Sequence, residues 1–282
     1  MKFLGLLDAD LDRTPLGTRA RLADDFAGTP VLRRTVERIA ACADLADIVV
    51  CCPAEQQPRV AQLLAGTRAR VVGRNAPPPP FRHLVRAARK WSLDGWRGGL
   101  GGSTALDEYV DPVLCALLGR ETKADAVAVF PPGAALIDPA LVAAMLAHAA
   151  THVEDSKLTF AQAPPGLVPT VFQTGLCVQL AEKHVPAGWT LAYKPDDPSI
   201  DLVFRPCNFP VPQAVRYASG RLTADTARSW RLMQRIHAAD PTDAEALCTL
   251  LLAESERCVD PRPREVEVEL TTEDPLPETP LR

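Results

Sequence analysis

The sequence predicts an α/β protein whose central sheet is mostly parallel and covered by helices on both faces. Short apolar runs of strand length alternate along the chain with segments whose apolar residues recur at helical spacing. This alternation is typical of a parallel sheet with helical crossovers. The chain has 282 residues, of which 47% are hydrophobic and 23% charged, so it can form a large apolar core.

The first half of the chain shows this alternation clearly. Three strands are expected, in KFLGLL (2–7), ADIVVCCP (46–53) and ARVVG (69–73). Three helices are expected, over 30–43, 55–66 and 81 to about 91. In the first of these helices Val31, Val36 and Ile39 lie at helical spacing, and Pro30 suits a first turn.

The same alternation continues after residue 105. Two further helices, LDEYVDPVLCALLGRET (106–122) and DPALVAAMLAHAATHV (138–153), are expected beside two strands, ADAVAVF (124–130) and LTFAQAP (158–164). Asp138 is a good N-cap for the second helix, with Pro139 at its first position. Ligands of parallel sheets bind where the strands end, and those ends fall at 8–21, Pro53, Gly73 and 131–135.

The composition changes after about Asp240, and three regions are expected. Residues 1–240 form the main domain, 241–260 a C-terminal helix, and 261–282 a tail rich in Pro and Glu or a linker to a further domain.

Charge and apolar patterning exclude several classes of protein. The net charge is −4 and the basic residues form no run, whereas a nucleic-acid groove needs a basic footprint. The N-terminal apolar run meets Asp8 before it reaches the length of a secretory signal. Prolines interrupt the apolar segment 126–150, so it cannot cross a bilayer as one helix. The eight cysteines form no CxxC, and we expect a cytoplasmic protein without structural zinc.

Four segments, in order, resemble the motifs of one known family. They are LGTRARLADDFAGTPVLRRTVERI (16–39), GGSTALDEY (101–109), AVFPPGAALIDPALVAAM (128–145) and GRLTADTARSWRLM (220–233). This series resembles the nucleotidyltransferase branch of the GT-A fold, and in particular the cytidylyltransferase-like enzymes of the spore-coat polysaccharide and CMP-sugar synthetase type. The resemblance implies a three-layer α/β/α, Rossmann-like fold with a mostly parallel central sheet.

The resemblance also implies an activity and its partners. A nucleotidyl group would pass from a nucleoside triphosphate to a sugar or sugar acid, with Mg²⁺ as cofactor and release of pyrophosphate. The pathway would be cell-surface polysaccharide biosynthesis. A nucleotide-sugar is the expected product or ligand, and a homodimer is compatible with the family.

The active-site motifs are degenerate in this chain. The loop lysine of the family falls near Asp24 or Asp25, and its metal-binding aspartate falls near Gly133 or Ala134. Of the active-site carboxylates that the resemblance leads one to expect, this chain retains one, Asp225 in RLTADT. Loss of one charge-stabilising group typically costs about 2.7–4 kcal/mol in the transition state. A catalytically degenerate nucleotide-sugar-binding or scaffolding module is therefore the alternative to an active enzyme.

The first loop supplies the expected phosphate contacts. Arg19 and Arg21 are the predicted catalytic cations, and Arg13 is a further phosphate ligand, because a guanidinium group suits phosphate oxygens. Backbone N–H groups at Gly17 and Thr18 would add to them. The alternative is a solvated loop in which the arginines pair with the acids around them.

Three carboxylates are candidates for the metal site. Asp225 is predicted as a metal ligand and catalytic residue, although an Asp or Thr at this place also suits a helix N-cap. Asp10 or Asp8 is a replacement metal ligand, and Asp8 is also predicted to lie at the bound nucleotide, unless both acids shape a turn. A GT-A glycosyltransferase is the third reading, but it requires a carboxylate pair where the sequence has PPGAA, at 131–135.

The glycine-rich segment KWSLDGWRGGLGGST (90–104) is expected beside the nucleotide. Trp96 offers a stacking face, and Gly101, Gly102 and Ser103 allow close approach of the backbone. The alternatives are an ordered Ω-like loop and a dimer contact. Residues 193–212 are a candidate acceptor loop.

Overall fold

The computed structural model describes residues 1–90, 92–97, 104–191 and 204–257, and it confirms the α/β fold class. The strands are β1 (Phe3–Asp8), β2 (Asp25–Phe26), β3 (Thr29–Pro30), β4 (Leu45–Pro53), β5 (Arg70–Arg74), β6 (Ala126–Val129), β7 (Leu158–Ala161), β8 (Thr170–Gln173) and β9 (Asn208–Phe209). The longer α-helices are α1 (Val31–Ala40), α2 (Gln57–Leu63), α3 (Arg82–Arg89), α5 (Pro112–Glu121), α6 (Pro139–Thr151), α7 (Thr174–Lys183), α9 (Ala227–Ala238) and α10 (Ala244–Arg257). The short helices are η1 (Ala54–Gln56), α4 (Leu106–Tyr109), η3 (Ala187–Leu191) and α8 (Gln213–Tyr217).

The central sheet is mostly parallel, as predicted. Within the described residues it has seven strands in the order β5-β4-β1-β6-β8-β7-β9. β1 is parallel to both of its neighbours, β4 and β6, and β4 is parallel to β5. β8 runs antiparallel to β6 and β7, and β9 is parallel to β7.

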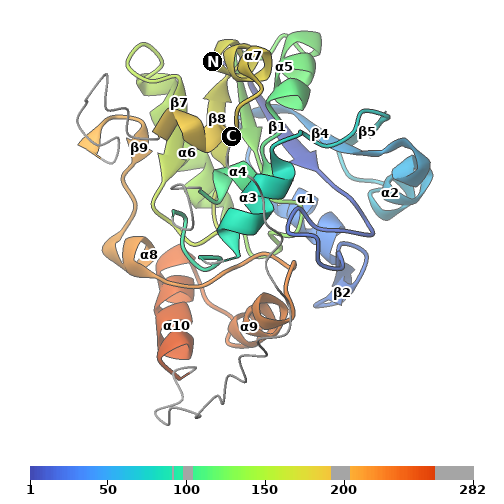
Figure 1. Ribbon diagram of the computed structural model, residues 1–282. Coiled ribbons are helices and arrows are strands. Elements are labelled where there is room, and N and C mark those ends of the chain that lie inside the picture. Colours follow the sequence, from blue (N-terminus) through green and yellow to red (C-terminus); the bar gives the residue numbers. More distant parts are fainter. Residues whose placement is uncertain (91, 98–103, 192–203, 258–282) are drawn as a thin grey trace, which may run out of the picture.

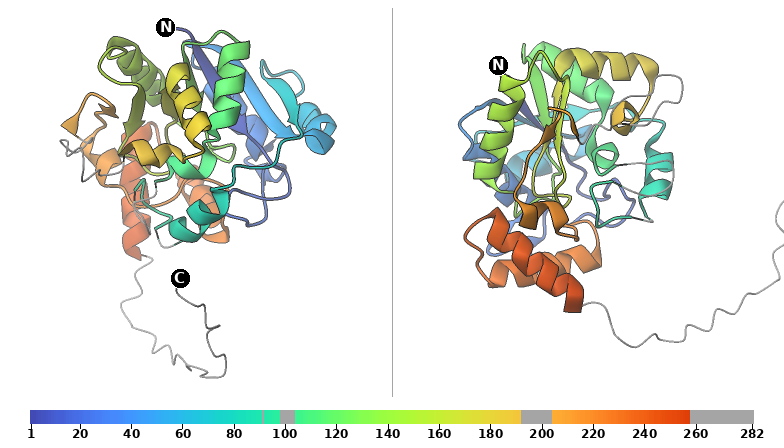
Figure 2. Two further views of the ribbon diagram at one scale, coloured as in Figure 1. Left: turned by 45° about the horizontal axis from the view of Figure 1, so that its top comes forward. Right: turned by 90° about the vertical axis from the view of Figure 1, so that its left-hand side faces the viewer.

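Helices cover both faces of the sheet, so the molecule has three layers (Figure 2). Alternate side chains of β1 separate the two cores: Phe3 and Leu7 face one apolar cluster, and Leu4 and Leu6 face the other. Buried side chains of α1, α2 and α6 belong to the first cluster, and those of α5 and α7 to the second. α8, α9 and α10 gather at the end of the molecule opposite the N-terminus (Figure 1).

The helix predicted over 106–122 is wrong in one respect, because the chain forms two helices there. α4 ends at Tyr109, Val110 is extended (φ −84°, ψ 120°), and α5 begins at Pro112. A residue that precedes proline is disfavoured in the helical region, so Asp111 is extended as well. Its carboxylate accepts hydrogen bonds from the Val113 and Leu114 N–H groups at 3.0 and 3.2 Å and caps α5.

The predicted C-terminal helix contains α10, and the division of the chain into regions stays a prediction. No helix in the part of the chain that the structure describes has the length and apolar character needed to cross a membrane.

Candidate functional site

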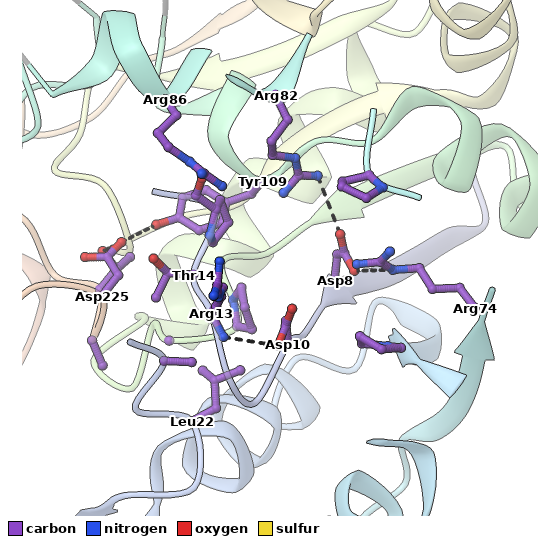
Figure 3. A pocket seen from close by; sticks show the side chains of 18 of the residues that line it. Asp8, Asp10, Arg13, Thr14, Leu22, Arg74, Arg82, Arg86, Tyr109 and Asp225 are labelled. Carbon is purple, nitrogen blue, oxygen red and sulfur yellow. Dashed lines mark hydrogen bonds and ion pairs between the residues drawn. The ribbon is translucent and has the colours of Figure 1, made fainter. Parts of the chain in front are cut away.

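A cavity of about 420 Å³ opens where β1, β4 and β5 end (Figure 3). Its wall is completed by the loop after β1, by α3, and by segments around Gly133 and Asp225. The basic and acidic side chains that line it are four arginines and four carboxylates: Arg13, Arg74, Arg82, Arg86, Asp8, Asp10, Glu55 and Asp225. We call this cavity the arginine pocket. It lies at the edge of the sheet where the sequence predicts ligand binding.

Asp8, the last residue of β1, lies between two arginines (Figure 3). Arg74 Nε is 3.0 Å from one carboxylate oxygen, and Arg82 Nη2 is 3.6 Å from the other. Burial alone would lower the pKa of the Arg74 guanidinium, but the adjacent Asp8 carboxylate raises it above its ordinary value. The Arg74 guanidinium therefore stays charged, and the Asp8 side chain that it contacts is only 7% exposed.

Arg82 has donors without acceptors. Its Nε and Nη2 atoms are buried and have no hydrogen-bond partner, since 3.6 Å to Asp8 is too long for a hydrogen bond. Nη1 donates a long hydrogen bond of 3.4 Å to the Glu108 carbonyl oxygen. A buried donor without a partner costs about 1–3 kcal/mol, more if it is charged, unless a ligand or water completes it. Arg82 therefore points to an anionic ligand.

The loop after β1 is held by Asp10. One carboxylate oxygen of Asp10 accepts from the N–H groups of Asp12 and Arg13, at 2.8 and 3.1 Å, and from Gln56 Nε2 at 3.1 Å. These bonds form the turn that the sequence offers as the alternative to metal binding. Metal binding by Asp10 stays a prediction.

Gly17 and Arg86 bring the loop and α3 together. Gly17 has φ +83°, which favours glycine, and a Cβ there would be 2.9 Å from Arg86 Cζ. Arg86 Nε donates to the Pro15 carbonyl oxygen at 3.2 Å. Thr18 Oγ1 donates to the Asp225 carbonyl oxygen and lies 2.6 Å from Thr14 Oγ1. Gly17 and Thr18 thus support the pocket without lining it.

The structure places Arg19 and Arg21 away from the arginine pocket. Both pair with Asp24, at 2.9 and 3.2 Å, and the Arg21 guanidinium lies 5.4 Å from the centre of the Trp230 ring. Neither arginine lines the cavity. This is the local pairing offered as the alternative to phosphate binding, and the catalytic role predicted for Arg19 and Arg21 stays untested.

Asp225 lines the pocket, but its carboxylate is bonded to the protein. It accepts from Tyr109 Oη at 2.8 Å, Thr223 Oγ1 at 2.9 Å and Arg221 Nε at 2.8 and 2.9 Å. The helix N-cap beside it is Thr226, which forms a capping box with Ser229 at the start of α9.

Arg221 connects Asp225 to a buried ionic network. Arg221 Nη2 lies 2.5 Å from Glu108 Oε2, and Arg89 Nε lies 2.6 Å from Glu108 Oε1. Burial would lower the pKa of Arg221, but Glu108, Tyr109 and Asp225 raise it well above its ordinary value. Burial raises the pKa of Tyr109 well above its ordinary value, although Arg221 opposes this shift, so the phenol stays protonated and donates to Asp225.

The carboxylates do not fit the divalent ion that the resemblance implies. Among the described residues no three His, Cys, Asp or Glu side chains gather as metal ligands would. At the position where the family has its aspartate, Gly133 packs against Ala224: the Ala224 N–H donates to the Gly133 carbonyl at 3.0 Å, and a Cβ on Gly133 would be 3.0 Å from the same nitrogen. A carboxylate side chain at Gly133 would require the Ala224 backbone to shift, and the Asp225 carboxylate already accepts from Tyr109, Thr223 and Arg221. We therefore derive no step through a metal ion.

Trp96 lies outside the arginine pocket. Its ring stacks on Phe160 with centroids 5.1 Å apart, and it lines a small apolar hollow of about 40 Å³. Tyr109 lines both this hollow and the arginine pocket. Gly101, Gly102 and Ser103 lie outside the described residues, as does most of the candidate acceptor loop. Nucleotide binding by Trp96 stays a prediction.

Sequence reasoning did not identify Arg74, Arg82, Arg86 or Tyr109, which all line the pocket. Two signals were present in the sequence. Arg74 directly follows the Gly73 strand end, and Arg82 and Arg86 stand four residues apart on one face of a predicted helix.

No family model matches the chain, and no curated protein is significantly similar to it in sequence. Solved structures are similar in fold. A cytidylyltransferase from Leptospira borgpetersenii serovar Hardjo-bovis (strain JB197) is 14% identical, with a TM-score of 0.55 over 92% of this chain and 95% of that chain. The chain has a cytidylyltransferase-like fold.

Two further structures extend this comparison of the cytidylyltransferase-like fold. CMP:2-keto-3-deoxy-manno-octonic acid synthetase, described in complex with CTP, is 12% identical, with a TM-score of 0.50 over 85% of this chain and 100% of that chain. Rv0371C from Mycobacterium tuberculosis, described in complex with manganese, is 16% identical, with a TM-score of 0.43 over 83% and 99% of the two chains. At these identities the first two structures show the fold alone, and no conclusion is drawn from the third, whose TM-score is below 0.5.

Proposed function

We propose that this chain binds a nucleoside triphosphate or a nucleotide-sugar through its phosphate groups in the arginine pocket. The observation that carries the proposal is Arg82, whose buried Nε and Nη2 atoms have no hydrogen-bond partner at the wall of a cavity shared with three other arginines. Planar guanidinium groups donate paired hydrogen bonds to phosphate oxygens. The position of the cavity at the strand ends supports the proposal, because ligands bind there in open α/β sheets.

Arg82 and Arg86 are the phosphate ligands that we propose in place of Arg19 and Arg21. They lie one turn apart on α3, and Arg13 and Arg74 reach the same cavity from the loop after β1 and from the end of β5. On the remaining wall, Asn75 offers an amide that can donate to and accept from a base or a sugar hydroxyl.

The proposed reaction is transfer of a nucleotidyl group, of the CMP type, to a sugar or sugar acid in cell-surface polysaccharide synthesis. An oxygen of the acceptor would attack the α-phosphorus, and pyrophosphate would leave with the electron pair of the broken P–O bond. Guanidinium groups near the leaving pyrophosphate would stabilise its negative charge. The predicted cytoplasmic location and homodimer belong to this proposal, whereas the carboxylates of the pocket do not support the Mg²⁺ that the resemblance implies.

One observation favours the second candidate, a binding module without turnover. The strand end at Gly133 and Ala134 carries no carboxylate, and Gly133 is packed against Ala224. The same observation disfavours a GT-A glycosyltransferase, which needs acids at that place. An assay for pyrophosphate release from CTP in the presence of sugar acids distinguishes the two candidates. An active enzyme should release pyrophosphate, and a binding module should not.

Calorimetric titration with CTP, and then with the other nucleoside triphosphates and with nucleotide-sugars in the same buffer, tests the binding proposal. We expect saturable heat with at least one of them. Arg82→Gln should weaken this binding roughly 10- to 100-fold, because a hydrogen bond to a charged group contributes about 1.5–3 kcal/mol. Arg19→Gln is the matched control and should bind as the unchanged chain does. Absence of heat with every nucleotide would contradict the proposal.

A further inference from the structure

We propose that guanidinium groups of the arginine pocket bind the phosphates directly, with no divalent cation between ligand and protein. This inference rests on the proposed function and specifies the chemistry of the site. The ligand class is a phosphate ester with at least two negative charges, such as the diphosphate of a nucleotide-sugar.

The first support is that three of the four carboxylates of the pocket, Asp8, Asp10 and Asp225, already accept hydrogen bonds or form ion pairs within the protein. Mg²⁺ in nucleotide sites is usually held by one or two carboxylates together with the phosphates. Asp8 lies between Arg74 and Arg82, and one oxygen of Asp10 accepts three hydrogen bonds. Asp225 accepts from Tyr109 Oη and from other donors around it. The fourth carboxylate, Glu55, is exposed in the first turn of the short helix η1, and one exposed carboxylate is fewer than the pair that would neutralise a divalent ion.

The second support is the charge that remains. Within the described residues, Arg13 and Arg86 line the pocket without an acid at ion-pair distance. Their two guanidinium charges equal the charge of one divalent ion. Arg82 adds buried donors without acceptors. Positive charge for a phosphate ligand is therefore present in the side chains themselves.

The third support is the arrangement of these groups. Arg82 and Arg86 lie four residues apart on α3, about 6 Å along the axis, and can bind oxygens of neighbouring phosphates. Gly17 leaves space for the Arg86 guanidinium against the loop after β1. Arg13 comes from that same loop, so the ligand would be held between the loop and the helix.

Asp8 gives this inference a distinctive prediction. If the arginines bind phosphate directly, Asp8 competes with the ligand for Arg74 and Arg82. Asp8→Asn removes the competing charge but keeps an oxygen that accepts from Arg74 Nε, so the affinity for CTP should rise, by about 3- to 10-fold. If Asp8 instead held a cation for the ligand, the same substitution would weaken binding. Asp24→Asn is the matched control, because Asp24 pairs with Arg19 and Arg21 outside the pocket.

The test is calorimetric titration of the full chain with CTP, once in EDTA and once in excess Mg²⁺. We expect binding in EDTA at least as tight as in Mg²⁺, tighter binding by Asp8→Asn, and an unchanged Kd for Asp24→Asn. If Asp8→Asn does not fold, Arg86→Ala replaces it in the test, because Arg86 is exposed and its substitution should not prevent folding. Arg86→Ala should weaken CTP binding at least 10-fold in both buffers. Binding in Mg²⁺ alone would overturn the inference and leave the proposed function standing. Absence of binding in both buffers would overturn the proposed function, and the inference with it.

Discussion

Gly17 has a backbone conformation that side chains rarely adopt, and it also leaves space for Arg86. Gly17→Ala should cost about 1–3 kcal/mol of folding free energy through strain at positive φ, and it should also displace Arg86 and weaken nucleotide binding. Gly28→Ala is a matched control, since Gly28 has φ +82° with nothing within 4 Å of an added Cβ. Urea denaturation and titration with CTP measure the two effects. Equal loss of affinity in both variants would contradict the role assigned to Arg86.

Arg221 is the cation of the buried network at Asp225. Arg221→Met leaves Asp225 without its cation, and removal of one partner from a buried ion pair typically costs about 3–5 kcal/mol. Arg228→Met is the comparison, because Arg228 pairs with Asp94 at 2.8 Å while its own side chain is 67% exposed, and such surface pairs contribute about 0–1 kcal/mol. The free energy of unfolding, measured in urea, should fall more in Arg221→Met than in Arg228→Met. Similar losses would show that the network does not stabilise the fold.

At the scale of elements, the start of α5 depends on Asp111. Asp111→Ala removes the cap and should lower the free energy of unfolding by about 0.5–2 kcal/mol. Burial raises the pKa of Asp111, which means that the charged form is disfavoured in the folded state. Asp111→Asn keeps a capping oxygen without the charge, so it should be as stable as the unchanged chain or more stable at pH 7. Thermal or urea denaturation measures both; a loss with Asn as large as with Ala would contradict capping.

Elements with local signals could be predicted from the sequence. Asp138 and Pro139 begin α6 as expected, and the apolar run after Lys123 forms β6. The break before Pro112 was missed because helical spacing on both sides outweighed a single proline. β8 and α7 were not predicted, since a short antiparallel strand followed at once by a helix has no periodicity of its own.

The candidate site was predicted in part, and the reason is physical. Asp8, Asp10 and Arg13 line the pocket because they lie at the end of the first strand or in the loop after it. Arg82 and Arg86 were missed because their approach to that loop depends on how α3 packs, and this contact joins residues about seventy positions apart. The order of strands in the sheet was not predicted for the same reason, because it depends on contacts between segments that are distant in the sequence.

At the scale of the whole molecule, the buried cysteines should make stability depend on pH. Burial, together with the Asp8 carboxylate, raises the pKa of the Cys51 thiol from 9.0 to about 12. In the unfolded chain the thiol ionises above about pH 9 while the folded thiol stays protonated, so the free energy of unfolding falls as pH rises. One such thiol contributes about 1.4 kcal/mol between pH 8 and 10.

Cys51→Ala should make this fall shallower by roughly that amount, whatever it costs in stability at neutral pH. Urea denaturation in the presence of a reductant, at several pH values from 7 to 10, measures the slope. A slope identical to that of the unchanged chain would show that the Cys51 thiol titrates alike in the folded and unfolded states.

The most direct test of the central claim is a crystal structure of the chain with CTP. We expect the phosphate groups within hydrogen-bond distance of Arg82 and Arg86 at the strand ends of the arginine pocket. Phosphates bound at Arg19 and Arg21 instead, or CTP bound elsewhere on the molecule, would contradict the claim that these guanidinium groups form the nucleotide site.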